Sequence, residues 1–221
     1  MEQVKQIRAD AIMCPNAVEL DHFSRSGGSV IQPPPADLAS IVKKNHPIIG
    51  YYGALARWFD YDLVRQAAQK HSDWEFVLIG PDHDNTLTAS NILSMPNVHW
   101  LGSRDYSQLP NYLGYFTVAT IPFVVNNITL ATSPIKLFEY MAAAKPIVTS
   151  DMPECRKYPG VLVAQNSTEF IDLLEHALTL IHDSKYLQQL YQTAQENTWE
   201  VRVRQIVEAI SRKPPMDDES A

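Results

Sequence analysis

The chain has 221 residues, of which 45% are hydrophobic and 19% charged, as is usual for a globular protein with a substantial core. The 25 acidic and 18 Lys or Arg residues give a net charge of -7, which argues against nucleic acid or an anionic membrane surface as the main partner. No run approaches the roughly 18 apolar residues of a membrane span, and no apolar signal core opens the chain, so we expect a cytoplasmic protein.

Cysteine and histidine usage points away from disulfide and metal chemistry. Cys14 and Cys155 are too few for a disulfide framework, which fits a reducing compartment. The seven histidines lack the spacing of paired ligands, so we expect no metal site. The letters DHD at 82–84 follow a Gly-Pro turn and are interpreted as a surface loop.

The first 45 residues differ in character from the rest of the chain. Residues 9–23 predict one strand and a turn, and residues 24–40 are rich in Gly, Pro and Ser, which is typical of a linker. Their apolar pattern is too weak to fold alone. We expect residues 1–45 to be the remnant of a preceding domain together with a linker.

Short apolar runs alternate with helical patterns from residue 46 onward. Strands are predicted at 47–52, 74–80, 97–102, 116–123, 145–150 and 160–164. Helices are predicted at 60–71 with Asp60 as N-cap, at 106–115 where Pro110 interrupts, at 153–158, and from Ser167 with Asn166 or Ser167 as the cap. This alternation predicts a doubly wound, Rossmann-like parallel α/β sheet over 46–195, which binds ligands at the carboxyl ends of its strands.

The last part of the chain adds two further helical patterns and a polar end. Helices are predicted at 184–195 and 198–211, and we treat 196–211 as a C-terminal helix outside the main domain. Residues 212–221 are polar and are expected to be disordered.

The segment ATSPIKLFEYMAAAKPIVTS, residues 131–150, places two charges in an otherwise apolar helix. With Ser133 as N-cap and Pro134 at the first helical position, Lys136 falls in the first turn. A cation there opposes the helix dipole by about 0.3–1 kcal/mol, and a bound phosphate would remove the conflict. Glu139, one turn on, could accept hydrogen bonds from ribose hydroxyls, so the pair describes a nucleotide site. The alternative is a Lys136–Glu139 pair on a solvated surface.

The same segment resembles the donor-site signature of retaining glycosyltransferases with the GT-B fold, the group 1 or family-4-like enzymes. One branch of that group carries S-P-x-K-x-x-E-Y-x-A-x-G-x-P-V-V, and this chain has matching residues from Ser133 to Val148. The stretches IIGYYGALARWFDYDLV, NVHWLGSRDYSQLPNYL, CPNAVELDHF and ENTWEVRVRQIVEAI are similar to other parts of that branch. The resemblance covers about residues 9–211 and implies the C-terminal, nucleotide-sugar-binding half of a GT-B enzyme.

The resemblance implies roles for nine residues in binding a UDP- or GDP-linked sugar without a further cofactor. Glu139 would hold the ribose, and Lys136 with the amides near Ser133 and Pro134 the diphosphate. Gly53 would allow close approach of the backbone, and the alternative is a plain turn glycine. The base would be flanked by the loop with Gly102 and Tyr106, unless Tyr106 only packs, and Thr132 in loop 128–132 would face the sugar. Arg57 is the one basic residue near Gly53 and ranks lowest.

Three positions depart from the pattern of the group. Ala131 stands where many members carry the first Glu of E-x7-E, although this branch commonly lacks it. Ala54 follows Gly53 where many members have Arg. Ala144 replaces a glycine at the helix end, where a left-handed residue would cost about 1–2 kcal/mol.

A GT-B enzyme has two Rossmann-like domains, and we expect this chain to contain only the second. Catalytic residues on the acceptor side are therefore unknown from the sequence, as is the acceptor, which we expect to be a saccharide or a lipid-linked glycan in polysaccharide biosynthesis. A partner polypeptide with the acceptor domain, or self-association through exposed apolar residues of 9–23, would complete the site. Two alternatives stay open: a non-catalytic nucleotide-sugar-binding subunit or truncated product, and a sugar-nucleotide epimerase.

Overall fold

Six parallel strands form one sheet in the order β3–β2–β1–β4–β5–β6 in the computed structural model, which describes residues 6–8, 11–24 and 33–211. The strands are β1 Ile48–Tyr52, β2 Glu75–Ile79, β3 Val98–Trp100, β4 Val118–Ile121, β5 Ile147–Ser150 and β6 Val161–Ala164. Every residue of β1, β2, β4 and β5 is buried, as parallel strands covered on both faces require. The predicted doubly wound α/β fold is confirmed.

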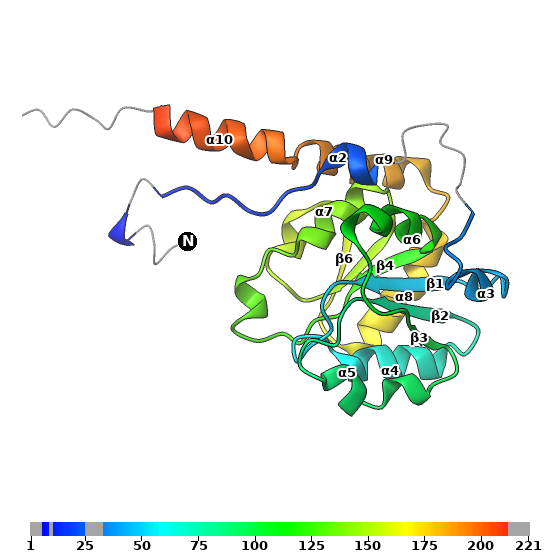
Figure 1. Ribbon diagram of the computed structural model, residues 1–221. Coiled ribbons are helices and arrows are strands. Elements are labelled where there is room, and N and C mark those ends of the chain that lie inside the picture. The colour runs from blue at the N-terminus through cyan, green and yellow to red at the C-terminus, as the bar shows by residue number, and fades with distance from the viewer. Residues whose placement is uncertain (1–5, 9–10, 25–32, 212–221) are drawn as a thin grey trace, which may run out of the picture.

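Helices cover both faces of this sheet, with α4, α5 and α8 on one side and α6 and α7 on the other (Figure 1). The α-helices are α2 Leu20–Phe23, α3 Ala39–Val42, α4 Tyr61–Lys70, α5 Thr86–Ala89, α6 Leu109–Tyr115, α7 Ile135–Ala142, α8 Ser167–Thr179, α9 Ser184–Gln195 and α10 Trp199–Ser211. The 3₁₀ helices are η1 Ile92–Ser94, η2 Tyr106–Gln108, η3 Thr129–Ala131 and η4 Cys155–Lys157.

Helix caps confirm most of the predicted starts. The Asp60 carboxylate accepts a hydrogen bond from the Leu63 amide, and the Asn166 side chain accepts one from the Glu169 amide. The prediction for 106–115 was wrong about Pro110, which lies in the first turn of α6, directly after η2, and does not interrupt a helix. A proline fits the first turn because its missing N–H has no partner there.

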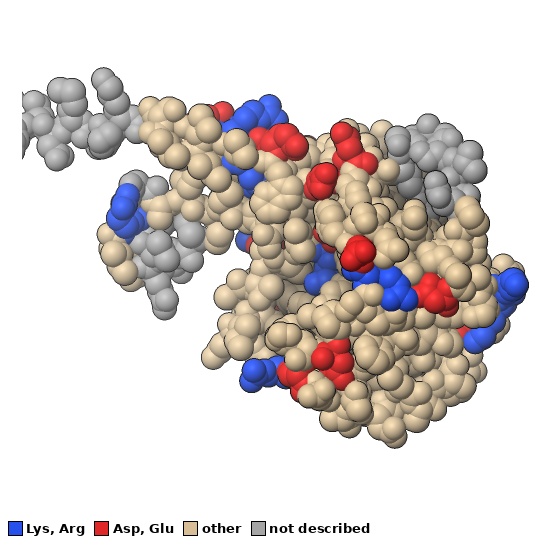
Figure 2. All heavy atoms as spheres, in the orientation of Figure 1, with Lys and Arg blue, Asp and Glu red and all other residues tan. Residues whose placement is uncertain are grey.

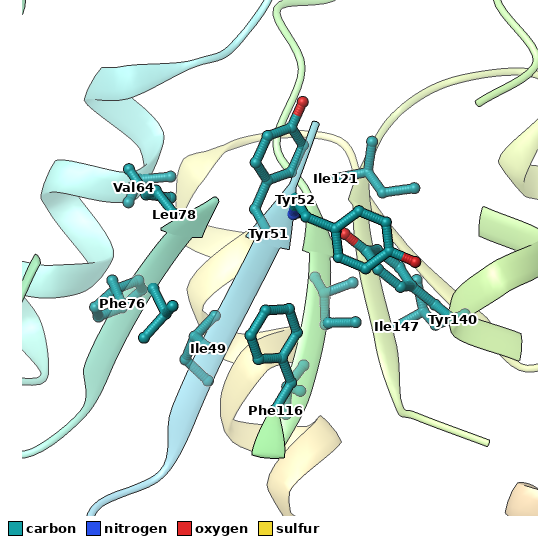
Figure 3. Packing of buried hydrophobic residues seen from close by; sticks show 14 of the residues in the cluster. Ile49, Tyr51, Tyr52, Val64, Phe76, Leu78, Phe116, Ile121, Tyr140 and Ile147 are labelled. Carbon is teal, nitrogen blue, oxygen red and sulfur yellow. The ribbon is translucent and has the colours of Figure 1, made fainter. Parts of the chain in front are cut away.

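The core is built on β1, whose neighbours approach the backbone closely. A Cβ at Gly50 would lie 2.2 Å from the Phe116 ring, so only glycine allows that ring to pack across the strand (Figure 3). On the α7 side, the Tyr52 and Tyr140 rings meet edge to face with centroids 5.0 Å apart, and the Tyr140 hydroxyl accepts from the Tyr52 amide. The helix that carries Lys136 and Glu139 is thereby fixed against β1.

The segment before the sheet packs on the domain, and its predicted strand was wrong. Residues 11–19 are extended with a single bridge, Val18 to Thr198, and α2 follows. The buried Arg202 of α10 donates to the carbonyl of Pro15, which joins this segment to the C-terminal helix. Leu38 and Ile41, within and just after the predicted linker, are buried against the sheet, whereas residues 25–32 lie outside the described residues.

The C-terminal helix α10 projects from the body of the domain, with the extended N-terminal segment running beside it (Figure 1). In the part of the chain that the structure describes, no helix has the length and apolarity needed to cross a bilayer. The predicted disordered tail, 212–221, lies outside the described residues.

Candidate functional site

The strand order reverses between β1 and β4, and this switch point positions the candidate site. Gly53 directly follows β1, and the connection from β4 leads through η3 to the first turn of α7. In doubly wound sheets, ligands bind in the crevice at the carboxyl ends of the strands beside such a point. The topology therefore brings the predicted phosphate and ribose residues to the place where the fold binds ligands.

The start of α7 corrects one prediction. Pro134 is the N-cap and not the first helical residue, and the Ser133 side chain caps nothing. The Ser133 hydroxyl instead accepts a hydrogen bond from the Asn16 amide at 3.2 Å, and the Asn16 side chain donates to the Ser133 carbonyl at 2.5 Å. The N-terminal segment thus engages the residue that local capping rules assigned to the helix.

Lys136 lies in the first turn of α7 with its half-buried side chain against two aromatic rings. Its Nζ is 5.3 Å from the centroid of Tyr51 and 5.2 Å from that of Phe123. Burial lowers the pKa of Lys136 to about 8, although the nearby Glu139 carboxylate opposes this. Among the described residues, no carboxylate forms an ion pair with Lys136, so the alternative of a Lys136–Glu139 surface pair is not found in this part of the structure.

Glu139 is buried on the same helix, only 3% exposed. Burial raises the pKa of this carboxyl, while the neighbouring Tyr52 hydroxyl and Lys136 ammonium act in the opposite direction. The Tyr52 hydroxyl is itself buried beside this carboxylate, and it does not reach the geometry of a full hydrogen bond to any described residue. A buried carboxylate next to an unsatisfied hydroxyl provides an acceptor and a donor for a ligand that carries paired hydroxyl groups.

Gly53 brings the backbone after β1 close to Lys136. Its φ is +134°, and a Cβ there would lie 2.8 Å from Cε of Lys136 and 3.0 Å from the Tyr51 hydroxyl. Gly80, after β2, has a φ of +142° and would bring a Cβ within 2.0 Å of the Gly53 carbonyl oxygen. Two glycines are therefore required for the tight packing at this edge, whereas the predicted approach of the Gly53 backbone to a ligand stays a prediction.

Tyr106 joins the site through residues that local sequence rules did not single out. Its ring is stacked on His22 at a centroid distance of 4.6 Å and meets Phe23 edge to face at 5.5 Å. Burial and the Glu139 carboxylate raise the pKa of Tyr106 to about 12, which places it near Glu139. Tyr52, His22 and Tyr106 surround Glu139 from three segments far apart in the chain, and only the resemblance of residues 14–23 to a known motif could have pointed to His22.

A small cavity of about 160 Å³ lies beside Gly53 at the carboxyl ends of β1 and β2. Tyr52, Gly53 and Gly80 line one side, and Ser103 and Arg104 the other. The Arg104 guanidinium donates to the Tyr112 hydroxyl, the Ser103 carbonyl and Asp37, which fixes the loop after β3. This cavity adjoins the predicted base-binding loop.

The other predicted residues are placed less directly. Gly102 adopts a φ of +72° and its carbonyl accepts from the Gly80 amide, so it shapes the loop without lining the cavity. The Thr132 hydroxyl donates to the Ile128 carbonyl within the turn around η3. Arg57 is largely exposed, and its described partner is Asp84, at 3.9 Å, so its contacts do not join it to Lys136 or Glu139.

Ala144 ends α7 in the left-handed conformation, with a φ of +49°. The Lys145 amide donates to the Tyr140 carbonyl and the Ala144 amide to the Met141 carbonyl, which is the hydrogen-bond pattern of a Schellman motif. The left-handed residue expected from the sequence is therefore present, although it is an alanine.

The acidic letters at 82–84 serve local structure. Asp82 accepts hydrogen bonds from the Leu87 and Thr88 amides, and Asp84 from Thr86 and the Arg57 amide. In residues 6–8, 11–24 and 33–211, no cluster of three or more His, Cys, Asp or Glu side chains could hold a metal ion. On the face shown in Figure 2, acidic and basic side chains are interspersed, without a broad basic patch.

The doubly wound parallel sheet has the Rossmann-like architecture found in solved GT-B glycosyltransferase structures. A family model described as glycosyl transferases group 1 matches residues 46–183, more than half of the chain. The chain belongs to that family.

Known relatives agree with this assignment and are longer. The chain is 28% identical over 198 residues to TuaH of Bacillus subtilis (strain 168), a glycosyltransferase named for teichuronic acid biosynthesis, and the match covers 87% of this chain and 48% of TuaH. Sucrose-phosphate synthase from Thermosynechococcus elongatus superposes with a TM-score of 0.67 at 16% identity, over 95% of this chain and 55% of that one. HepE from Anabaena, solved in complex with UDP-glucose, superposes with a TM-score of 0.61 at 16% identity, over 88% of this chain and 56% of HepE. The chain spans about half the length of these relatives.

Proposed function

We propose that this chain is the donor-binding half of a retaining glycosyltransferase that uses a UDP- or GDP-linked sugar in polysaccharide biosynthesis. The observation that carries the proposal is Lys136. Its ammonium sits at a helix N-terminus without an ion pair in the described residues, one turn from the buried Glu139. A nucleoside diphosphate satisfies both groups: its phosphates bind Lys136 and the free amides of the first turn, and its ribose hydroxyls bind Glu139.

In the proposed reaction, the bond between the anomeric carbon and the diphosphate oxygen breaks, and a bond to an acceptor hydroxyl oxygen forms. The nucleoside diphosphate leaves with the electron pair of the broken bond, and the proton of the acceptor hydroxyl passes to the leaving diphosphate oxygen or to solvent. Lys136 and the amides of α7 stabilise the negative charge that develops on the leaving diphosphate, at a helix N-terminus where the Lys136 side chain is half-buried. The UDP-glucose bound to HepE supports a nucleotide sugar as donor.

The test is a thermal-shift series with UDP, GDP, ADP, CMP and their common sugar conjugates. A ligand at 100 times its Kd stabilises by about 2.7 kcal/mol, which raises the midpoint by several degrees in a protein of this size. We expect one nucleotide to give this shift, and Glu139→Ala to abolish it. Glu196→Ala, an exposed residue at the end of α9, is the control and should keep the shift. A folded chain that responds to none of these ligands contradicts the proposal.

We further propose that the acceptor-side domain docks on the exposed face of α10. Val203, Ile206, Val207 and Ile210 form an apolar stripe on this helix, with exposed fractions of 41–79%. Ile12 and Met13 of the neighbouring segment are 50% and 53% exposed. Since the chain spans about half of its relatives, the occupant proposed here is a polypeptide that carries the other half of the site.

Gel filtration and light scattering of the purified chain test this docking surface. Ile206→Lys with Ile210→Lys should leave the unfolding midpoint within about 1 °C, because both side chains are exposed. The pair should abolish assembly with an added acceptor-domain polypeptide. If the chain self-associates on its own and the same variant does not, the partner that binds this face of α10 is a second copy of the chain and not an acceptor-domain polypeptide. An acceptor-domain polypeptide that assembles equally well with the unchanged chain and with the double variant would refute the proposal that it docks on α10.

A further inference from the structure

A second cavity, of about 400 Å³, lies at the carboxyl edge of the sheet away from α7. It is bounded by the ends of β5 and β6 and by the first turns of α4 and α8, the helices on the opposite face from α7 (Figure 1). Phe123, after β4, lines it and is also one of the two rings that contact Lys136. The cavity is thus a neighbour of the donor site, separated from it by Phe123.

The charge of this cavity excludes a second nucleotide. Asp60 and Asp62 line it, and no Lys, Arg or His is among its lining residues. The ion pair of Asp62 is with Arg65, at 3.4 Å and outside the lining. A phosphate or carboxylate would meet the Asp60 carboxylate, which has no ion pair among the described residues, in a lining without a basic side chain, so the lining favours a neutral ligand.

The same lining offers hydrogen-bonding groups that the described residues leave unused. The Ser150 hydroxyl is buried without a partner, in a residue only 5% exposed. Gln66 on α4 and Gln165 before α8 have no side-chain hydrogen bond in the described part of the chain, and Asp60 uses only one carboxylate oxygen to cap α4. A buried hydroxyl without a partner costs about 1–3 kcal/mol, which a ligand hydroxyl would recover.

We propose that this cavity is a binding site for a neutral saccharide unit, distinct from the donor site. Amides, a carboxylate and a hydroxyl can each bind sugar hydroxyl groups, which both donate and accept. Leu63, Ala164 and Phe170 give the cavity an apolar floor for the C–H face of a sugar ring. Its volume falls in the range of small-ligand sites, about 300–1,000 Å³. A glycan bound here lies next to Phe123, within reach of the Lys136 side of the domain.

The experiment follows backbone amide shifts of the ¹⁵N-labelled chain during titration with maltose, lactose and chitobiose, with glucuronate as the acidic comparison. We expect at least one neutral disaccharide to shift the amides of Leu63, Asn166 and Ser167. Gln66→Ala combined with Gln165→Ala should weaken binding at least about 5-fold per lost hydrogen bond, since about 1 kcal/mol is a factor of 5.

Two comparisons separate this site from the donor site. Gln69→Ala, an exposed residue on the same helix as Gln66, removes the same group outside the cavity and should leave saccharide binding unchanged. Saturating UDP or GDP should not displace the saccharide. The Glu139→Ala variant should bind the saccharide as well as the unchanged chain does. Four results overturn the proposal: no neutral saccharide binds up to about 20 mM, glucuronate binds best, the cavity variant binds as well as Gln69→Ala, or the shifts map to Gly53 and Lys136.

Discussion

Replacing Ala144 by glycine should stabilise the protein, because Ala144 closes the site helix in a conformation that suits glycine. Its φ of +49° lies in the left-handed region, and its amide and that of Lys145 complete the hydrogen bonds that end α7. Glycine adopts this backbone without the Cβ contact that penalises every other L-residue. The change removes one methyl group and leaves the hydrogen bonds of the helix end in place.

The expected gain follows from two opposing quantities. The left-handed conformation costs alanine about 1–2 kcal/mol, and this cost disappears in Ala144→Gly. Glycine also raises the conformational entropy of the unfolded chain, which lowers the free energy of unfolding by about 0.4–1 kcal/mol. The net gain in the free energy of unfolding is about 1 kcal/mol, which corresponds to a midpoint increase of about 2–4 °C for a chain of this length.

Thermal unfolding followed by far-ultraviolet circular dichroism, supported by urea titration, measures this gain. Ala143→Gly is the matched control, because residue 143 has a φ of −81° and a ψ of 3°, which alanine adopts without strain. It should lower stability by about 0.5–1 kcal/mol. If Ala144→Gly lowers the midpoint as much as Ala143→Gly does, the left-handed cost is not what limits this helix end.

Three further predictions concern the sheet edge and the core. Gly53→Ala should destabilise the protein and prevent nucleotide binding in the thermal-shift assay, because its Cβ would meet Lys136 at 2.8 Å on a backbone with a φ of +134°; unchanged binding would contradict the close approach. Because burial lowers the pKa of Lys136 to about 8, nucleoside diphosphate affinity measured by calorimetry should fall as pH rises through 8, while Lys136→Arg should show no such fall below pH 10. Glu75→Gln should cost about 2 kcal/mol in urea unfolding, because the buried Glu75 carboxylate binds Lys44, His46 and His99 at 2.9, 2.9 and 2.5 Å. Burial raises the pKa of Glu75, but these three partners lower it below its ordinary value, so their contribution should be present above that ordinary value and lost as pH falls through the lowered one; a Glu75→Gln profile parallel to wild type in acid would refute this.

The sheet could be predicted because each strand carries its own signal. Runs such as Ile48–Tyr52, and Glu75–Ile79 after its first residue, are mainly apolar and bounded by polar helices or turns, so composition separates them. The parallel, doubly wound arrangement follows from the alternation of strand and helix, whereas the order of the strands is known only from the structure. Residues 11–19 misled the same rule: they contain apolar side chains, but their one bridge joins Val18 to Thr198, a partner nearly the whole chain away.

The candidate site could be predicted where its residues are close in sequence. Lys136 and Glu139 share a helix face because they are three residues apart, and no tertiary information is needed for that. Ser133 was misassigned because Asn16, 117 residues earlier, binds its hydroxyl and carbonyl. His22 and Tyr52 reach Glu139 only through the packing of α2 and β1 on α7, and spacing rules carry no information about such contacts.

Lys136 is the residue whose own interactions leave the most to a ligand. It opposes the dipole of α7, and burial lowers its pKa, so keeping it charged costs free energy in the unliganded chain. Cation–π contacts with the rings of Tyr51 and Phe123 offset this cost by about 0.5–2 kcal/mol in total. An uncharged side chain such as methionine at this position would carry no such cost. A half-buried cation that is already oriented loses little further freedom when an anion arrives, so part of the cost carried by the free protein becomes affinity for a diphosphate.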